Sequence, residues 1–194
     1  YISNESSGKQ GYEIALALNK LGFKTTLIIG PSNLIKQKNI KTKKIVTAQE
    51  MFEEVKKSLP VDVAICAAAV SDFKPVQKNK SKIKKDHKSF KSINFENSKD
   101  VVEFLGKNNK HRPKLVVGFS AETENVNKNS LIKMKKKNCD LIIANDVSKK
   151  DFGFNSDYNK VSIIDNKGQI KIIKKSKKSF IANKIAEVIL DKLL

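Results

Sequence analysis

The sequence has no tryptophan, only two cysteines and only two histidines among its 194 residues. Cys66 and Cys139 both lie in apolar stretches, which excludes a disulfide scaffold or a cysteine-based zinc site and indicates a reducing compartment. His87 and His111 belong to no Cys/His cluster, so we expect no protein metal site. No apolar run reaches the ~18 residues that a membrane helix needs. We therefore expect a cytoplasmic protein without a membrane partner.

Arginine is also nearly absent, because 38 of the 39 basic residues are lysines and only Arg112 is an arginine. The net charge is nevertheless +19 and the pI is near 9.8. A basic nucleic-acid-binding module is therefore an alternative, and it predicts salt-dependent affinity for duplex DNA. Proteins that read bases or phosphates bidentately depend on arginine. Since the lysines are scattered along the whole chain, we interpret most of them as a solvated coat and expect no specific nucleic-acid partner.

Strand-like and helix-like segments alternate along the chain, a pattern typical of a parallel sheet covered by helices. Residues 61–69 form a nearly continuous apolar run, which predicts a strand buried on both faces. Asn166-Lys167-Gly168 separates two strand-like stretches and indicates a β-hairpin, 161–165 with 169–173. We predict one α/β domain over residues 1–194, with a mostly parallel sheet, flanking helices and a β-hairpin appendage. The other expected strands are 23–29, 115–119 and 141–144, and the expected helices are 8–21, 48–59, 99–105, 127–138 and 179–194.

A lysine-rich segment interrupts this alternation. Residues 78–91 contain seven lysines in fourteen positions and almost no apolar side chain. Such a composition predicts a mobile connection, and a lysine within it can close over a polyphosphate as part of a lid. We place this lid at about residues 74–92. A solvated charge run is the alternative for most of its lysines.

The first candidate for chemistry is the loop Asn4–Gly11, which leads into the first expected helix. Backbone N–H groups at a helix N-terminus form an anion site, and glycines let a phosphate approach closely. The spacing is neither that of a Walker A loop nor the G-x-G-x-x-G of dinucleotide-binding proteins. A capped helix with a glycine for packing against the sheet explains the loop equally well, and both interpretations stay open.

Two further candidates follow expected strands. Asp72 comes after the strand that ends in Cys66-Ala67-Ala68, and Phe119 ends the strand 115–119. Ligands of open α/β sheets bind outside the carboxyl ends of the strands, so a carboxylate there suits a binding role. Capping of the following turn is the alternative for Asp72. Phe119 can stack on a base, and Lys133 and Lys137 share one helix face, although ordinary helix solvation also explains the lysines.

The ordered set of motifs resembles phosphopantothenate–cysteine ligase, which in bacteria is usually the second half of a bifunctional coenzyme A biosynthesis protein. The motifs are ISNESSGKQG, AAAVSDFKP, KIKK, VGFSAET, the lysine pair, DLIIANDV and FGFNSDYN, and they cover residues 1–159. The resemblance implies a Rossmann-like homodimer. It also implies activation of 4′-phosphopantothenate by CTP and Mg²⁺ to an acyl-cytidylate, which L-cysteine then converts to an amide. FMN would accompany only a decarboxylase half attached upstream.

The resemblance also implies residue roles. Asn4 and Lys82 would be catalytic, Asn4 by steadying the acyl-cytidylate and Lys82 by supporting its formation. Ser6, Ser7 and Gly8 would join Asn4 in contacting phosphate and substrate. The implied nucleotide-binding residues are Cys66, Ala67, Ala68, Asp72, Lys82, Lys99, Asp100, Val101, Val102, Phe119, Lys133 and Lys137.

The chain departs from the family in two ways. Lys99 stands where the family has proline and Ser98 where it has asparagine, so the implied cytosine-recognition turn is less rigid. The family also has a strand and a Gly-Gly-Thr loop ahead of the Ile-Ser-Asn motif, whereas this sequence begins at Tyr1-Ile2-Ser3. We therefore expect the sheet to lack that N-terminal strand.

An NADP-dependent reductase of the Rossmann type is the remaining alternative. It is suggested only by the α/β pattern and by the early glycine loop. The absent G-x-G-x-x-G and the lack of an acid after the strand 23–29 count against it.

Overall fold

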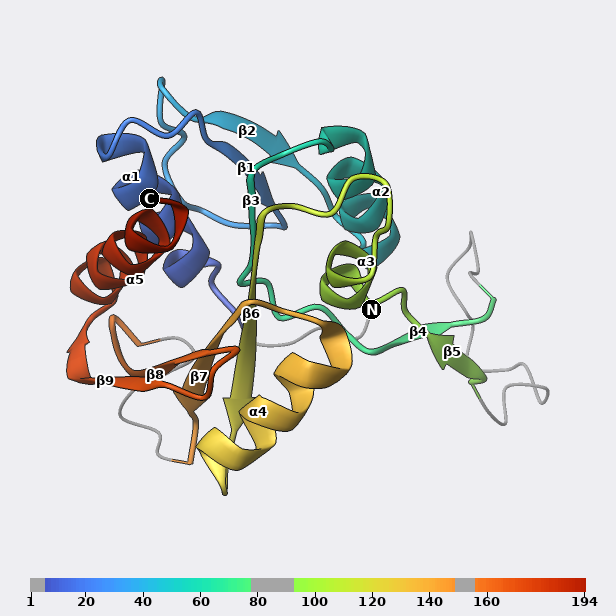
Figure 1. The fold of residues 1–194 in the computed structure, drawn as a ribbon. Coiled ribbons are helices and arrows are strands. Elements are labelled where there is room, and N and C mark those ends of the chain that lie inside the picture. Colours follow the sequence, from blue (N-terminus) through green and yellow to red (C-terminus); the bar gives the residue numbers. More distant parts are fainter. Residues whose placement is uncertain (1–5, 78–92, 149–155) are drawn as a thin grey trace.

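The computed structural model describes residues 6–77, 93–148 and 156–194 (Figure 1). Helices and strands alternate along most of the chain, as the sequence predicts. The helices are α1 (Lys9–Lys20), α2 (Ala48–Ser58), α3 (Val101–Gly106), α4 (Val126–Lys137) and α5 (Lys178–Leu193). The strands are β1 (Thr26–Ile29), β2 (Lys41–Lys44), β3 (Val63–Cys66), β4 (Phe73–Pro75), β5 (Phe95–Asn97), β6 (Leu115–Glu122), β7 (Leu141–Asp146), β8 (Tyr158–Asp165) and β9 (Ile170–Lys177).

The main sheet has five strands in the order β3-β6-β7-β8-β9. Strands β3, β6 and β7 are parallel, whereas β8 and β9 form the predicted hairpin and continue the sheet antiparallel to β7. Strands β1 and β2 form a separate parallel pair, and β4 and β5 an antiparallel one. The predicted mixed α/β fold, with a mostly parallel central sheet and flanking helices, is confirmed.

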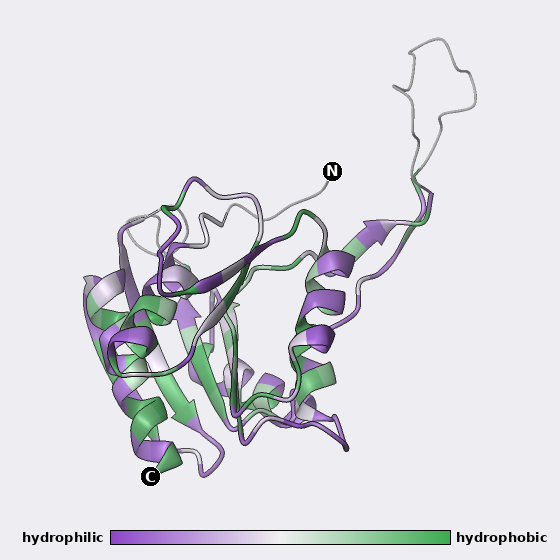
Figure 2. Ribbon diagram, turned by 90° about the horizontal axis from the view of Figure 1, so that it is seen from above, coloured by the Kyte–Doolittle hydropathy of each residue, from purple (hydrophilic) through white to green (hydrophobic). Residues whose placement is uncertain are grey.

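Helices cover both faces of the main sheet, because its central strands β6 and β7 are apolar on both sides (Figure 2). Along β6, Leu115 and Val117 pack toward α1 and α5, whereas Val116 packs toward α2, α3 and α4. This alternation follows from the period of two in a β-strand. The two resulting cores hold β6 and β7 between them and make these strands the rigid centre of the molecule.

The helix ends follow from local sequence. Thr47 caps α2 by accepting a hydrogen bond from the Glu50 N–H at 3.1 Å, as its capping-box pattern predicts. The Glu50 carboxylate reaches back to the N–H of Val46, one residue before the cap, at 2.8 Å. At the other end of a helix, Asn138 adopts a left-handed conformation with φ of 55° and terminates α4.

Two expectations about strands need correction. Strand β3 is shorter than the predicted 61–69, and its four residues are half-buried rather than buried on both faces. The physical reason is a hollow beside β3, between this strand and β1. Strand β2 was not predicted, because its sequence Lys-Thr-Lys-Lys has no apolar signal and it forms by pairing with β1.

The predicted lysine-rich lid lies largely outside the described residues, since residues 78–92 are not among them. Residues 74–77, at its beginning, belong partly to β4, which pairs with β5 to form an arm (Figure 1). Within the described ranges, no helix has the length and apolar character to cross a membrane.

Candidate functional site

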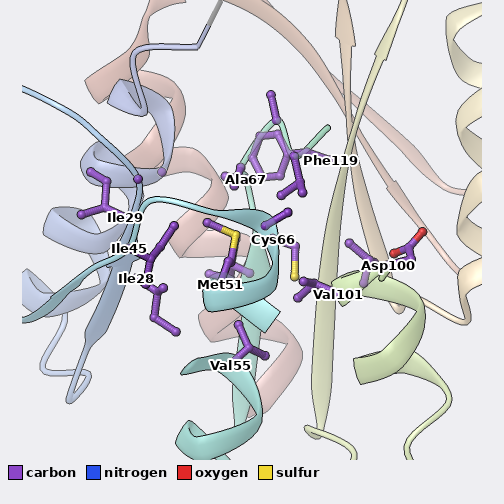
Figure 3. A pocket seen from close by; sticks show the side chains of 18 of the residues that line it. Ile28, Ile29, Ile45, Met51, Val55, Cys66, Ala67, Asp100, Val101 and Phe119 are labelled. Carbon is purple, nitrogen blue, oxygen red and sulfur yellow. The ribbon is translucent and has the colours of Figure 1, made fainter. Parts of the chain in front are cut away.

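A hollow of about 2830 Å³ lies between β1 and β3 and extends along the carboxyl ends of β3 and β6. Figure 3 shows Ile28, Ile45 and Met51 on one side of this hollow and Cys66 and Phe119 on the other. The side near β1 and α2 is lined mainly by large apolar side chains such as Ile28, Met51 and Val55. The edge near β3, β6 and α4 carries the polar and charged side chains, and this edge is the candidate site.

Strand pairing places the predicted residues at one edge. Cys66 of β3 lies opposite Gly118 of β6, so the residues that follow, Ala67 and Phe119, meet at the same end of the sheet. Segments far apart in the sequence therefore converge, as predicted. The predicted residues that line the hollow are Ser6, Gly8, Cys66, Ala67, Ala68, Asp72, Lys99, Asp100, Val101, Val102, Phe119, Lys133 and Lys137.

Three predicted residues need separate mention. Ser7 lines a small neighbouring cavity of about 40 Å³ rather than the main hollow. Ser6, Gly8, Ala67 and Phe119 border both spaces, so the two are contiguous along the first turn of α1. Asn4 and Lys82, the two residues with implied catalytic roles, lie outside the described residues.

The loop before α1 lies at this edge, since Ser6 and Gly8 line the hollow. Gly8 is the N-cap with φ of 72°, a conformation that favours glycine, and it supplies no side-chain cap. Ser6 and Ser7 accept hydrogen bonds from the N–H groups of Gly8 and Lys9, each at 3.4 Å. Because the first turn of a helix leaves N–H groups without intrahelical acceptors, the loop suits an anion.

A backbone hydrogen bond joins Asp72 to the turn that precedes α3. The Ser98 N–H donates to the Asp72 carbonyl at 2.8 Å. The Asp72 carboxylate is exposed and makes no hydrogen bond within the described ranges, which argues against the turn-capping alternative. The ammonium of Lys99 lies 4.8 Å from the centre of the Phe52 ring, a cation–π contact that holds this side chain beside α2.

Asp100 is held ionised at the edge of the hollow. Its Oδ1 accepts from the Glu103 N–H at 2.9 Å, and its Oδ2 lies 3.0 Å from Lys137 Nζ. Burial alone would raise the pKa of this carboxyl, but the hydrogen bonds and the Lys137 charge outweigh it and lower the pKa. Asp100 is thus both the N-cap of α3 and the anchor of Lys137.

Lys133 and Lys137 share one face of α4, as predicted, and both border the hollow. Lys133 Nζ lies 2.6 Å from Glu122 Oε1. Each lysine therefore has a protein carboxylate as its counter-charge. A phosphate chain entering the site would compete with Glu122 and Asp100 for these ammonium groups.

The thiols take no nucleophilic role. Burial raises the pKa of the Cys66 thiol to about 12 and that of Cys139 to about 11, so both stay protonated at neutral pH. Among the described residues, no group of three or more His, Cys, Asp or Glu side chains has the arrangement to hold a metal ion. What this edge offers is a surface of small side chains and backbone beside cationic groups.

Sequence reasoning missed part of the small cavity. Gln10, Asn145, Asn159 and Lys178 line it together with the first turn of α1. Asn159 and Lys178 are buried, at 2% and 5% exposure. In a chain with 38 lysines, no sequence signal separates one buried lysine from the exposed ones.

Comparison with known proteins identifies the family. The model of the DNA/pantothenate metabolism flavoprotein C-terminal domain matches residues 1–193. The chain belongs to this family. The predicted resemblance to the second half of the bifunctional coenzyme A biosynthesis proteins is thereby confirmed.

Members of the DNA/pantothenate metabolism flavoprotein family include close relatives of this chain. The coenzyme A biosynthesis bifunctional protein CoaBC of Haemophilus influenzae is 38% identical over 190 residues, which cover 97% of this chain and 47% of the relative. That of Borreliella burgdorferi is 39% identical over 191 residues, with coverages of 97% and 47%. The chain thus spans about half the length of these curated relatives.

Solved structures agree with this assignment. A crystal structure of the C-terminal domain of a CoaBC protein superposes with a TM-score of 0.79 and 30% identity, covering 97% of this chain and 84% of that domain. A complex of a Cab2 H337A mutant with phosphopantothenate-cysteine has a TM-score of 0.68 at 17% identity, with coverages of 97% and 79%. The second likeness concerns the fold alone.

Proposed function

We propose that this domain is a phosphopantothenate–cysteine ligase of coenzyme A biosynthesis that activates its acid substrate with CTP. The observation that carries the proposal is the convergence of four separate segments, represented by Ser6, Asp72, Phe119 and Lys137, around one hollow. Family membership supports the proposal, because the curated relatives are coenzyme A biosynthesis proteins.

The chemistry suits the residues at this edge. A carboxylate is a poor electrophile, so 4′-phosphopantothenate must first be joined to CMP, with loss of pyrophosphate, before the cysteine amine displaces CMP to form the amide. Ala67 and Ala68 leave room for a nucleotide against the strand end, and Phe119 offers a face on which a base can stack. Catalysis then consists of positioning and charge stabilisation rather than of a protein nucleophile.

The remaining roles, phosphate binding and charge stabilisation, would fall to the lysines, Asn4 and Mg²⁺. Lys133 and Lys137 would neutralise phosphate oxygens after exchanging their protein carboxylates for the ligand. Asn4 and Lys82 keep the roles that the resemblance implies, at the acyl-cytidylate and at the departing pyrophosphate. Mg²⁺ would be held by the phosphates of CTP, since Mg²⁺ binds readily through substrate phosphates with one or two carboxylates, and Asp72 is an exposed carboxylate at this edge.

A homodimer is part of the proposal. The arm formed by β4 and β5 and its flanks leaves large apolar side chains in contact with solvent, and such a surface suits a second copy of the chain. The exposed apolar residues of the arm are Phe73, Val76, Ile93 and Phe95.

The test is pyrophosphate release from CTP by the full-length protein in the presence of Mg²⁺ and 4′-phosphopantothenate, followed by formation of an amide product when L-cysteine is added. We expect Lys82→Gln to reduce pyrophosphate release by on the order of a hundredfold, because a charge that stabilises the transition state is lost. Asn4→Asp should instead let the acyl-cytidylate accumulate.

Lys88→Gln, in the same lysine-rich segment, is the matched control and should leave the rate unchanged. A full-length protein that releases no pyrophosphate under these conditions would contradict the ligase assignment. Unchanged pyrophosphate release by Lys82→Gln would contradict only the role of Lys82.

A further inference from the structure

Lys178 is a buried cation for which the described residues offer no direct ion pair. It is the first residue of α5 and is 5% exposed. Its backbone is well bonded, since its N–H donates to the Asp157 carbonyl at 2.9 Å and its carbonyl accepts from Gln10 Nε2 at 3.3 Å. Its ammonium, by contrast, has neither a hydrogen bond nor an ion pair to any residue that the structure describes. A buried ammonium of this kind is costly unless something pairs with it.

The surroundings raise the free-energy cost of burying the Lys178 charge further. It lies in the first turn of α5, where the helix dipole is positive and a cation is disfavoured. The nearby carboxylate of Asp157 is already bound by Lys9, whose Nζ lies 2.6 Å from Asp157 Oδ1. Burial lowers the pKa of Lys178, and the charge of Lys9 lowers it further, against a weaker opposing effect of Asp157. Among the described residues, the ammonium groups of Lys9 and Lys178 therefore share the carboxylate of Asp157, which is bound directly to Lys9 alone.

The small cavity beside Lys178 has room for a small anionic group. Its volume of about 40 Å³ corresponds to roughly three water-sized atoms. The first turn of α1 forms one wall, and the N–H groups of such a turn point toward an anion. The buried Gln10 Oε1 has no hydrogen-bond partner within the described ranges, which indicates that a ligand here also brings an O–H or N–H donor.

We propose that Lys178, together with the first turn of α1, binds a small oxyanion, a carboxylate or a phosphate, that belongs to one of the ligase substrates. The inference rests on the proposed function for the identity of the ligand, and on the cavity for its chemistry. Because Ser6, Gly8, Ala67 and Phe119 border both the cavity and the main hollow, a ligand anchored at Lys178 extends directly into the nucleotide site. Lys178 is thus a substrate-binding residue in a cavity that neither Lys133 nor Lys137 lines.

Thermal unfolding of the 194-residue protein tests the anion site without requiring turnover. Wild type, Lys178→Met and Lys177→Met are compared at constant ionic strength with increasing inorganic phosphate or acetate. Lys177 is the matched control, because it is the exposed neighbour and its replacement removes the same charge. We expect the anions to raise the unfolding midpoint of wild type and of Lys177→Met, and to leave that of Lys178→Met unchanged.

Without anion, Lys178→Met should unfold at the same or a higher temperature than wild type, because it replaces an uncompensated buried charge by an apolar chain of similar length. This result also shows that the variant folds. If the anions raise the midpoint of Lys178→Met as much as that of wild type, or raise neither, the proposed site is overturned.

Calorimetric titration of the full-length protein separates the sources of the oxyanion. 4′-Phosphopantothenate, L-cysteine and CTP are each titrated into wild type and both variants. We expect Lys178→Met to bind one of the three at least about tenfold more weakly, the loss expected for one hydrogen bond to a charged group. Equal affinities for all three would overturn the assignment to a substrate. A protein that binds anions through Lys178 but releases no pyrophosphate from CTP would contradict the proposed function and not the site.

Discussion

Arg112, the one arginine of the chain, has a structural role. Its Nε donates to the Gly106 carbonyl and its Nη2 to the Asn138 carbonyl, each at 2.9 Å. Nη2 also lies 3.0 Å from Asp140 Oδ2. The guanidinium therefore joins the ends of α3 and α4 to the start of β7. The one arginine of the chain is committed to the fold and is not available to read a nucleic acid.

Replacement of Arg112 tests this structural role. Lys in its place keeps the charge but cannot donate in three directions from a planar group, so carbonyls at the two helix ends lose a donor. We expect Arg112→Lys to lower the free energy of unfolding by about 1–3 kcal/mol, measured by urea denaturation. Lys114→Met is the control, since it removes only an exposed ion pair with Asp62 and should leave the free energy of unfolding unchanged. Equal unfolding curves for both variants would contradict the role of Arg112.

Single residues also mark the limit of prediction from this sequence. The position of Asp72 and Phe119 at the hollow was predictable, because ligands of an α/β sheet bind outside the carboxyl ends of its strands and both residues were expected near such an end. Lys178 was not, because its burial depends on the packing of α5 against α1 and its sequence context matches that of the exposed lysines. Propensity and periodicity depend on residues that are close in the sequence. The burial of a charge depends instead on residues that are close only in the folded structure.

At the scale of the element, the hairpin β8–β9 shows how one side chain fixes a turn. Asp165 Oδ1 accepts hydrogen bonds from the N–H groups of Lys167 and Gln169, at 3.0 and 2.9 Å. Its Oδ2 lies 2.9 Å from Lys192 Nζ of α5. Gly168 has φ of 81°, which the turn requires and which its sequence signal predicts. The carboxylate thus ties the turn to the C-terminal helix.

This arrangement predicts an acid-sensitive contribution to stability. Burial would raise the pKa of Asp165, but the Lys192 ammonium and the two turn amides outweigh it, so the folded pKa lies below the ordinary value. Since the unfolded chain binds the proton more tightly, the stabilisation is present above the unfolded pKa of about 3.9. It is lost as the pH falls through the folded pKa.

Asp165→Asn removes this charge and tests its contribution. We expect the variant to be less stable than wild type at pH 7 by about 1–3 kcal/mol, and to lose less further stability between pH 5 and 2. Urea denaturation at several pH values measures both effects. Asp191→Asn, at an exposed position of α5, is the control and should follow the wild-type profile. Parallel pH profiles for Asp165→Asn and wild type would rule out the role of Asp165.

Elements differ in how far their own sequence determines them. Strands β6 and β7 are buried apolar runs, and the sequence predicts both because a packed strand needs no other signal. Strands β2, β4 and β5 carry no such signal and form through their pairing partners. The candidate site depends mainly on strands that have an apolar signal of their own, so the position of its edge was predictable from the sequence. The shape of the hollow was not.

At the scale of the whole molecule, the hollow between β1 and β3 has the form of an open place in a sheet. Strand β1 pairs with β2 and β3 pairs with β6, and within the described ranges β1 and β3 do not pair with each other. Helix α1 begins above this gap. A Cβ at Gly8 would lie 3.5 Å from Ile29 Cδ1, and one at Gly11 would lie 3.4 Å from Ala67 Cβ. The first turn of α1 therefore lies between the carboxyl ends of the two strands.

This geometry is that of a right-handed β–α–β unit whose first strand would lie between β1 and β3 and lead through α1 to β1. We expect the family's upstream strand and Gly-Gly-Thr loop, when added ahead of Tyr1, to insert there parallel to both neighbours. Insertion would bury the apolar side chains that now line the hollow, such as Ile28 and Ile65. The extended protein should unfold at a higher temperature and bind CTP more tightly.

Hydrogen exchange checks the insertion directly, because each edge amide that gains an acceptor becomes protected. In the extended protein, amides of β1 and β3 should exchange more slowly than in the 194-residue chain, while those of β7, already paired on both sides, should change little. An extension of the same composition with two prolines in the strand is the matched control, since proline cannot supply the ladder hydrogen bonds. If both extensions protect β1 and β3 equally, the gap is not a strand site, and the charged edge beside it would have to bind its ligand without this central support.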